Sequence, residues 1–189
     1  RQKRKLRSFL ITLIMAVVLV LSGFICRMQA TRINNNEYES LISQSSATAL
    51  SDKIDSYEKA IAIYPARTDG YMKMLEAYED EGQFGKNENN EFLALYNANK
   101  DKFDTDSADY AELNYKTGMM YFNYYSEENG DNNFSDRVQK AYSFFATNYE
   151  NENISSEFTK KKISDCYYQI CSFYKKYILN SVTVEEASK

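Results

Sequence analysis

The strongest hydrophobic pattern in the sequence is an uninterrupted apolar segment near its start. From Ser8 to Cys26 only Thr12, Ser22 and Gly23 break a run of Phe, Leu, Ile, Met, Ala and Val, and no charge interrupts it. At about 1.5 Å per residue, a helix of this length spans roughly the 30 Å hydrocarbon core of a bilayer. The pattern predicts a single transmembrane helix.

Beyond this segment, apolar residues recur at steps of three and four, which is the period of an amphipathic helix. Period-two alternation is absent, and the chain has one proline and six glycines, so it carries few strand or turn signals. The sequence therefore predicts an all-α fold. The first helix runs on from the membrane or begins just after Asn36, and the others cover about 51–65, 68–82, 88–102, 107–126, 134–149 and 155–179.

These patterns and the local composition divide the chain into five predicted parts. They are a basic juxtamembrane segment over 1–7, the transmembrane helix over 8–26, a linker over 27–36, a helical domain over 37–180 and a flexible tail over 181–189. Within the helical domain, residues 85–90 and 128–133 are rich in Asn, Gly and Asp, which is typical of loops.

The positive charges around the apolar segment predict its orientation. Five Lys and Arg precede Ser8, and only Arg27 and Arg32 follow closely. The positive-inside rule then places the N-terminus in the cytoplasm and the rest of the chain outside the cell membrane. Because the sequence begins with Arg1, we expect it to be part of a longer protein, cut just before its membrane helix.

Two other interpretations of the apolar segment remain open. A cleaved signal peptide would need a shorter apolar region and a small-x-small site, but Met28-Gln29-Ala30 has the wrong first residue and no small residue directly precedes Cys26. A helix buried in a soluble core would show an amphipathic stripe, which is not visible here.

The part of the chain after Arg32 is strongly acidic. It contains 16 Lys and Arg against 27 Asp and Glu, a net charge of −11. Such a surface is unsuited to nucleic acid or to an anionic membrane, and cationic or polar partners are electrostatically easier. The membrane contact is therefore assigned to residues 8–26 alone.

The sequence offers little catalytic chemistry. It contains no histidine, so Ser-His and Cys-His nucleophiles cannot be built, and it has no glycine-rich phosphate loop. Cys166 and Cys171, five residues apart on a helix, point to different sides and are expected to be buried and unbridged. We expect no enzyme activity, no metal and no cofactor in this chain. Carboxylates such as Glu76 and Glu79 leave open an envelope hydrolase, although a charged run is usually a solvated helix face.

One stretch in the middle of the chain has the spacing of a known repeat. It resembles the tetratricopeptide repeat, in which paired helices carry large, small and helix-stopping residues at fixed steps. A small Ala lets two helices approach closely, Pro ends the helix, and Gly permits a tight turn. The matching positions are Tyr57, Ala60, Pro65, Tyr71, Met74, Leu75, Tyr78, Gly82 and Phe84.

Outside this stretch the match is weaker. Gly118 with Tyr121 suggests another first helix, and Ala141 with Phe145 another second helix. About 43 residues separate Tyr71 from its equivalent near Asn114, so the connection must contain an insertion. The resemblance implies an array of antiparallel helix pairs, and the alternative is an unrelated helical bundle.

If the array has a ligand groove, repeat geometry predicts where it lies. Twelve of the 17 tyrosines fall within residues 96–177, and aromatic-rich concave faces can bind peptides or sugars, although tyrosine at helical spacing more often fills a core. First-helix positions between the repeat residues would face the groove. These are Asp69, Met72, Glu76 and Glu79, and by the weaker alignment Tyr115, Met119 and Phe122.

The whole arrangement resembles the C-terminal half of membrane serine/threonine kinases of Gram-positive bacteria. The features that carry this resemblance are the basic cluster, the single span, and the sequences Tyr-Glu-Lys-Ala-Ile (57–61) and Leu-Glu-Ala-Tyr-Glu-Asp-Glu-Gly (75–82). It implies an upstream cytoplasmic kinase and an outer module that senses a protein, peptide or cell-wall ligand. No kinase residue lies in this chain. The alternative is a constitutive scaffold that holds envelope proteins without signalling.

Overall fold

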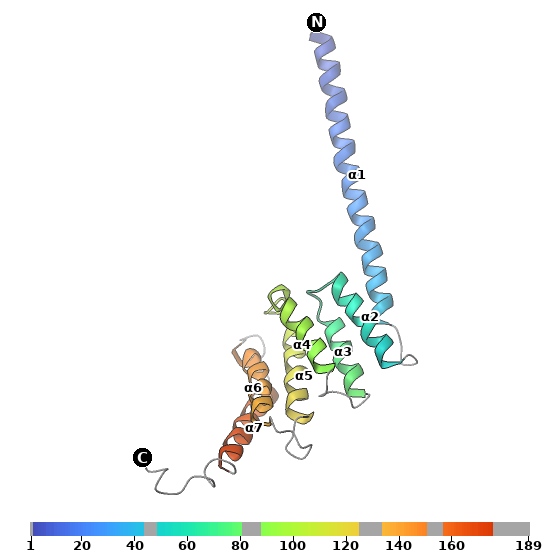
Figure 1. Ribbon diagram of the computed structural model, residues 1–189. Coiled ribbons are helices and arrows are strands. Elements are labelled where there is room, and N and C mark those ends of the chain that lie inside the picture. Colours follow the sequence, from blue (N-terminus) through green and yellow to red (C-terminus); the bar gives the residue numbers. More distant parts are fainter. Residues whose placement is uncertain (1, 44–48, 81–87, 125–133, 151–156, 176–189) are drawn as a thin grey trace.

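The chain is all-α throughout the residues that the structure describes. The computed structural model describes residues 2–43, 49–80, 88–124, 134–150 and 157–175, and no strand occurs among them (Figure 1). The fold class predicted from the sequence is therefore confirmed. The helices are α1 (Gln2–Ile42), α2 (Leu50–Ile63), α3 (Asp69–Asp80), α4 (Glu88–Asn99), the short 3₁₀ helix η1 (Lys100–Lys102), α5 (Ala108–Tyr124), α6 (Phe134–Glu150) and α7 (Glu157–Phe173).

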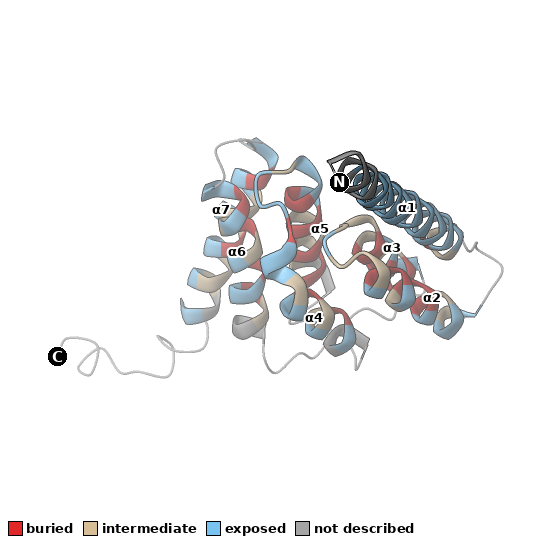
Figure 2. Cartoon of the chain, turned by 90° about the horizontal axis from the view of Figure 1, so that it is seen from above, coloured by how far each residue is buried: buried red, intermediate tan, exposed pale blue. Residues whose placement is uncertain are grey.

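Helix α1 is one unbroken helix of 41 residues that projects far beyond the other helices (Figure 1). It is the one helix among the described residues that is long and apolar enough to cross a membrane, and its apolar side chains from Leu10 onward are exposed (Figure 2). The predicted linker over residues 27–36 lies inside this helix and is not a separate, irregular segment. Extending a helix that already exists costs little even through Asn34–Asn36, because only nucleation is expensive.

The last turns of α1 pack against α2 and α3. Tyr38 is completely buried there, and its ring meets the ring of Tyr64 edge-on with 5.5 Å between centroids. The apolar part of α1 and the other helices are therefore joined by continuous helix, and α2 and α3 pack around its end.

Helices α2 and α3 bury the faces that their periodicity predicts. On α2 these are Ile54, Tyr57, Ala60 and Ile61, and the helix ends just before Pro65 as expected. On α3 the buried set includes Tyr71, Met74, Leu75 and Tyr78. Gly82 and Phe84, which complete the predicted repeat, lie outside the described residues.

Helix α4 and η1 together cover residues 88–102, which matches the helix predicted there. Together with Phe103, which directly follows η1, they contribute aromatic side chains to the core. Phe103 lies between Tyr71 and Tyr96, with ring centroids 5.1 and 5.6 Å away, and the Tyr96 hydroxyl donates to Asn114 Oδ1 on α5 at 2.6 Å. Residues 88–90, placed in a loop by composition, belong to α4.

Helices α5 and α6 make the most extensive contact between two helices in the part of the chain that the structure describes. A Cβ atom on Gly118 would lie 2.7–2.9 Å from the ring carbons of Phe145, so only glycine allows the two helices to approach this far. Val138, Ala141 and Phe145 of α6 are all buried at this contact. Glycine therefore sets the spacing of this pair.

Helix α7 packs on α6, and its two cysteines do not behave alike. Cys166 is buried as predicted, and burial raises its pKa to about 12. The prediction that Cys171 is buried was wrong, since its thiol is exposed. Five residues turn a helix by about 140°, so a helix that buries one position on a neighbour presents the other to solvent. The predicted loop at 128–133 and tail at 181–189 lie outside the described residues.

Candidate functional site

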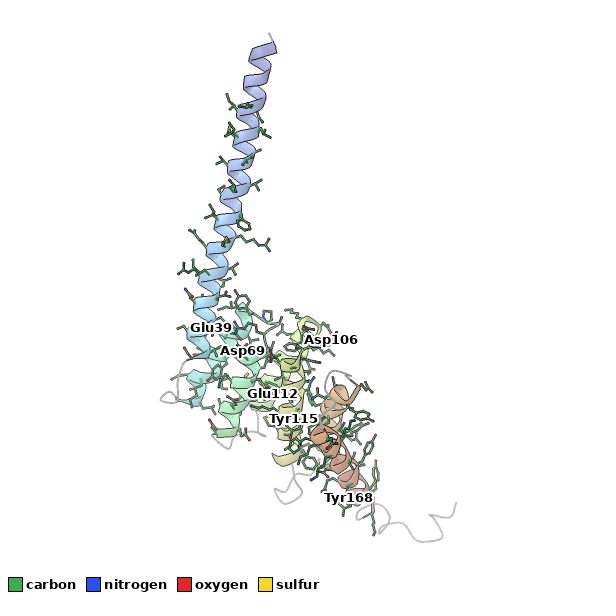
Figure 3. All side chains as sticks on the ribbon, turned by 180° about the vertical axis from the view of Figure 1, so that it is seen from behind. Glu39, Asp69, Asp106, Glu112, Tyr115 and Tyr168 are labelled. Atoms are coloured by element: carbon green, nitrogen blue, oxygen red, sulfur yellow. The ribbon has the colours of Figure 1, made fainter. Side chains whose placement is uncertain are left out.

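The candidate site is a face built by alternate helices. The end of α1 contacts α3, α3 contacts α5, and α5 contacts α7. Figure 3 shows Glu39, Asp69, Glu112 and Tyr115 following one another across the molecule, on α1, α3 and α5. We call the part between the third and fifth helices the α3–α5 groove. Its residues are Asp69, Met72, Glu76 and Glu79 on α3, and Glu112, Tyr115, Lys116 and Met119 on α5.

Helices α3 and α5 present matching positions to this groove. At a separation of 43 residues, Tyr71 corresponds to Asn114 and Tyr78 to Tyr121, and all four side chains are buried. By the same offset Met72 corresponds to Tyr115 and Glu76 to Met119, and all four are only half-buried. Each of the two helices therefore buries one set of positions and leaves the neighbouring set partly exposed at the groove.

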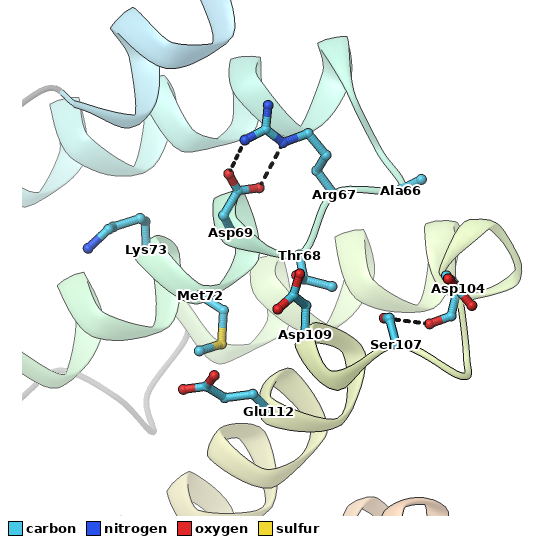
Figure 4. Close-up of a pocket in the computed structure, with 10 residues that line it drawn as sticks. All are labelled: Ala66, Arg67, Thr68, Asp69, Met72, Lys73, Asp104, Ser107, Asp109 and Glu112. Atoms are coloured by element: carbon cyan, nitrogen blue, oxygen red, sulfur yellow. Dashed lines mark hydrogen bonds and ion pairs between the residues drawn. The ribbon is translucent and has the colours of Figure 1, made fainter. Parts of the chain in front are cut away.

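The larger cavity of the groove lies at the first turns of α3 and α5 and has a volume of about 520 Å³ (Figure 4). Met72 and Ala66 give it an apolar portion, and the rest of its wall is polar. Four acidic and two basic side chains surround it, so its net charge is negative. The lining residues are Ala66, Arg67, Thr68, Asp69, Met72, Lys73, Asp104, Ser107, Asp109 and Glu112.

Some charged side chains of this cavity already form ion pairs, and others do not. Arg67 and Asp69 are paired with each other, and Lys73 is paired with Glu76 at 2.7 Å. Asp109 and Glu112 are exposed and make no hydrogen bond or ion pair with the described residues. A hydrogen-bond donor of a bound partner can therefore reach Asp109 or Glu112 on the α5 wall of the cavity without breaking an existing contact there.

The smaller cavity, of about 200 Å³, lies further along the same two helices. Glu76 is its centre, because Lys73 and Lys116 approach its two carboxylate oxygens at 2.7 and 3.0 Å. Burial acts to raise the pKa of Glu76, but the hydrogen bonds from these two lysines outweigh burial and lower it. The lining residues are Leu75, Glu76, Glu79, Tyr115, Lys116, Met119 and Met120.

The face continues from α5 to α7 through aromatic side chains. The Tyr115 ring lies 5.8 Å from that of Phe145 and 5.3 Å from that of Phe158, centroid to centroid. The Lys162 ammonium lies 5.1 Å from the centre of the Phe122 ring, within the range of a cation–π contact. This part of the face is therefore aromatic, with the Lys162 ammonium beside one of its rings.

The structure brings six of the seven predicted groove residues to the two cavities. Asp69 and Met72 line the larger cavity, and Glu76, Glu79, Tyr115 and Met119 line the smaller one. Phe122 lies under Lys162 near α7 and lines neither.

Sequence reasoning missed Arg67, Asp109, Glu112 and Lys116. The signal for the last two was present, because Glu112, Lys116 and Met119 follow one helix face at steps of four and three. Arg67 gave no such signal, because it lies between helices.

A third cavity, of about 440 Å³, lies away from this face, between α2 and α4. Glu58 faces it, and burial together with the charges of Glu91 and Asp55 raises the pKa of Glu58. Carboxylates are the main polar groups of this cavity, and no group of three or more metal-ligating side chains is placed to hold a metal ion in the part of the chain that the structure describes.

The tyrosines that the structure describes divide between core and surface. The tyrosines buried in the core are Tyr38, Tyr57, Tyr71, Tyr78, Tyr96, Tyr110 and Tyr121, and those that are exposed are Tyr149, Tyr167, Tyr168 and Tyr174.

No family model matches the sequence, and comparisons with curated proteins and with solved structures give no match either. The assignment of function therefore depends on the groove itself.

Proposed function

We propose that this chain is a membrane-anchored binding module, in which α1 spans the membrane and the helical domain outside it holds a protein or peptide segment in the α3–α5 groove. The observation that carries the proposal is the continuity of the face made by α1, α3, α5 and α7, with two cavities between α3 and α5. A surface assembled from successive first helices is how tetratricopeptide-like arrays hold extended ligands.

The side chains of the groove suit such a ligand. Met72 and Met119 provide adaptable apolar contact, and the half-buried Tyr115 ring provides a rigid one. The carboxylates of Asp109 and Glu112, which have no ion pair with the described residues, supply acceptors for backbone N–H groups or cationic side chains. Mixed apolar and polar walls of this kind are typical of peptide-binding clefts.

A photo-crosslinking experiment tests the groove in the full chain reconstituted in lipid nanodiscs. Benzoylphenylalanine replaces Met72 or Met119 in the groove, and Gln139 on the exposed side of α6 serves as the matched control. We expect discrete adducts with envelope proteins from both groove positions and none from the control. Equal adducts at all three positions would contradict the proposal.

The native Cys171 thiol provides a test of orientation. It is exposed, whereas Cys166 is buried, so a membrane-impermeant maleimide applied to intact cells should label the chain through Cys171. Because Cys26 is exposed as well, both samples carry Cys26→Ser, and the Cys171→Ser variant in this background is the control that should lose the label. Labelling of Cys171 that requires cell lysis would place the domain in the cytoplasm and refute the proposed orientation.

We further propose that the module belongs to a sensor whose cytoplasmic part is a serine/threonine kinase, as the sequence resemblance implies. The alternative is a scaffold that holds partners at the membrane without signalling. The coding sequence upstream of Arg1 separates the two, because a kinase domain there supports sensing and a start codon directly before Arg1 supports a scaffold.

A hydrolase built on Glu76 is less consistent with the site. A general acid must hold its proton near neutral pH, which requires a raised pKa. The two lysines lower the pKa of Glu76 instead. The Glu76→Gln and Glu79→Gln variants should therefore leave unchanged any hydrolytic activity that the purified chain has.

A further inference from the structure

The end of α1 is held by a side chain at the start of α3. The hydroxyl of the fully buried Tyr38 donates a hydrogen bond to Asp69 Oδ1. Tyr38 is the one buried residue among those of α1 whose burial the structure describes, 10–42, so this contact is central to how the membrane helix is seated on the domain.

Arg67 completes the attachment from the loop between α2 and α3. Its Nε and Nη2 atoms donate to the two carboxylate oxygens of Asp69 at 3.2 and 2.5 Å. Its Nη1 atom donates to Glu39 Oε1 on α1 at 3.0 Å, and its guanidinium carbon lies 3.9 Å above the Tyr38 ring. We call Tyr38, Glu39, Arg67 and Asp69 the α1 clamp.

Two members of the α1 clamp also line the larger cavity. Arg67 and Asp69 belong to its wall, and their side chains are 41% and 40% exposed. Figure 4 shows Asp109 and Glu112 of α5 facing the start of α3 across this cavity. An occupant of the cavity can therefore reach the same carboxylate and guanidinium that hold α1.

Helix α1 connects the clamp to the membrane without a break. It extends from Gln2 to Ile42, about 60 Å at the usual rise per residue. A helix of this kind moves as a rigid element, so a change of contact at Glu39 is carried toward the span and is not absorbed by a loop.

We propose that the α1 clamp couples occupancy of the larger cavity to the seating of the membrane helix. A group in the cavity that binds the Asp69 carboxylate draws this carboxylate away from Tyr38, and a group that binds the Arg67 guanidinium draws it away from Glu39. Either change releases the last turns of α1 from α3. Such an occupant binds the released state more tightly than the clamped one, which is the condition for shifting the equilibrium. The coupling rests on the proposed function only in taking the groove to be the place where a partner binds.

The first measurement establishes the clamp in the full chain in nanodiscs, by hydrogen exchange of the amides of residues 37–43. The Asp69→Asn variant should exchange about tenfold faster there, because local opening no longer breaks a charged contact. Asp101→Asn is the control, an exposed carboxylate of η1 that lines none of the cavities described above, and should leave this exchange unchanged. The amides of α6 provide the internal reference in each sample.

The second measurement places a cation in the cavity without needing the natural ligand. In a Cys26→Ser, Cys171→Ser background, Asp109→Cys is modified with a trimethylammonium-ethyl methanethiosulfonate, while Cys166 stays unreactive because it is buried. The cationic adduct should speed exchange of residues 37–43 about tenfold, and the small neutral methyl disulfide at the same position should not.

The result that overturns the proposal is unchanged exchange of residues 37–43 in the cationic adduct while Asp69→Asn accelerates it. If Asp109→Cys also loosens α6, the same reagents at Glu112→Cys decide the question. Because no partner protein is used, failure of the crosslinking experiment leaves this result untouched, and failure of the coupling leaves binding in the groove untouched.

Discussion

Helix α5 has two unlike sides, and the difference between them separates stability from binding. Toward α6 it is sealed, with Gly118 directly against the Phe145 ring and Asn148 Nδ2 donating to the Ala111 carbonyl at 2.7 Å. Toward α3 it is open, with two cavities and an ion pair between Lys116 and Glu76. We infer that the α5–α6 contact holds the domain together, while the α3–α5 contact leaves room for a partner.

The largest expected effect is the loss of Phe145. Its side chain is completely buried, and Phe145→Ala should destabilise the domain by about 3–5 kcal/mol through lost burial and a cavity. Urea unfolding of the full chain in detergent micelles, followed by the near-ultraviolet circular dichroism of the tyrosines, measures this.

The matched control for Phe145 is Phe158, which is 56% exposed at the start of α7. Phe158→Ala should change stability by less than about 1 kcal/mol. Equal losses from the two variants would mean that stability does not depend on the α5–α6 contact in particular.

A smaller effect is expected from Gly118→Ala. The added methyl would sit 2.7–2.9 Å from the buried Phe145 ring, and overpacking of this kind costs about 1–3 kcal/mol, partly offset by the better helix propensity of alanine. In a Phe145→Leu background the clash should largely disappear, so a double-mutant cycle should give a coupling energy of about 1 kcal/mol or more.

Gly70→Ala is the comparison for this cycle on the other side of the domain. A Cβ atom there would meet Ile61 Cγ1 at 3.0 Å, which is less severe than the 2.7–2.9 Å at Gly118 and needs a shift of only a few tenths of an ångström. We expect a smaller loss of stability than at Gly118, and independence from Phe145→Leu. A coupling as large as that of Gly118 would show that the two sites do not report separate contacts.

The contrast also explains what the sequence could predict. The helix positions follow from apolar residues at a period of 3.6, and this signal is strong wherever one face is buried, as at Tyr71 and Tyr78. The same period places Met72 and Glu76 on the neighbouring face, which is why most of the groove residues could be named in advance.

The rest depends on contacts that no local pattern encodes. Lys116 and Glu76 are 40 residues apart, and Tyr38 and Asp69 are 31 apart, so both pairs require the packing of whole helices. The polar residues Asn34–Asn36 were interpreted as part of a linker, because sequence reasoning weighs residue propensity. The structure continues α1 through them, since neither proline nor glycine interrupts residues 27–36.

The smallest expected effect is at the ion pair that bridges the groove. Glu76 has a lowered pKa, so its contribution to stability is present above the pKa of an unfolded glutamate, about 4.3, and is lost as the pH falls through the lower folded value. Because the pair is partly exposed, Glu76→Gln should cost only about 0.2–1 kcal/mol at pH 7 and less in high salt. The difference from the unmutated chain should vanish in acid, once Glu76 is protonated in both states.

Glu79→Gln is the matched control, because this carboxylate lies one turn further along α3, lines the same cavity and has no ion pair with the described residues. It should leave the urea midpoint unchanged at both pH values. A loss from Glu76→Gln as large as that from Gly118→Ala would mean that α3 and α5 form a second sealed contact. The groove would then have to open at a high cost in stability before any partner could enter, and the distinction between the two sides of α5 would fail.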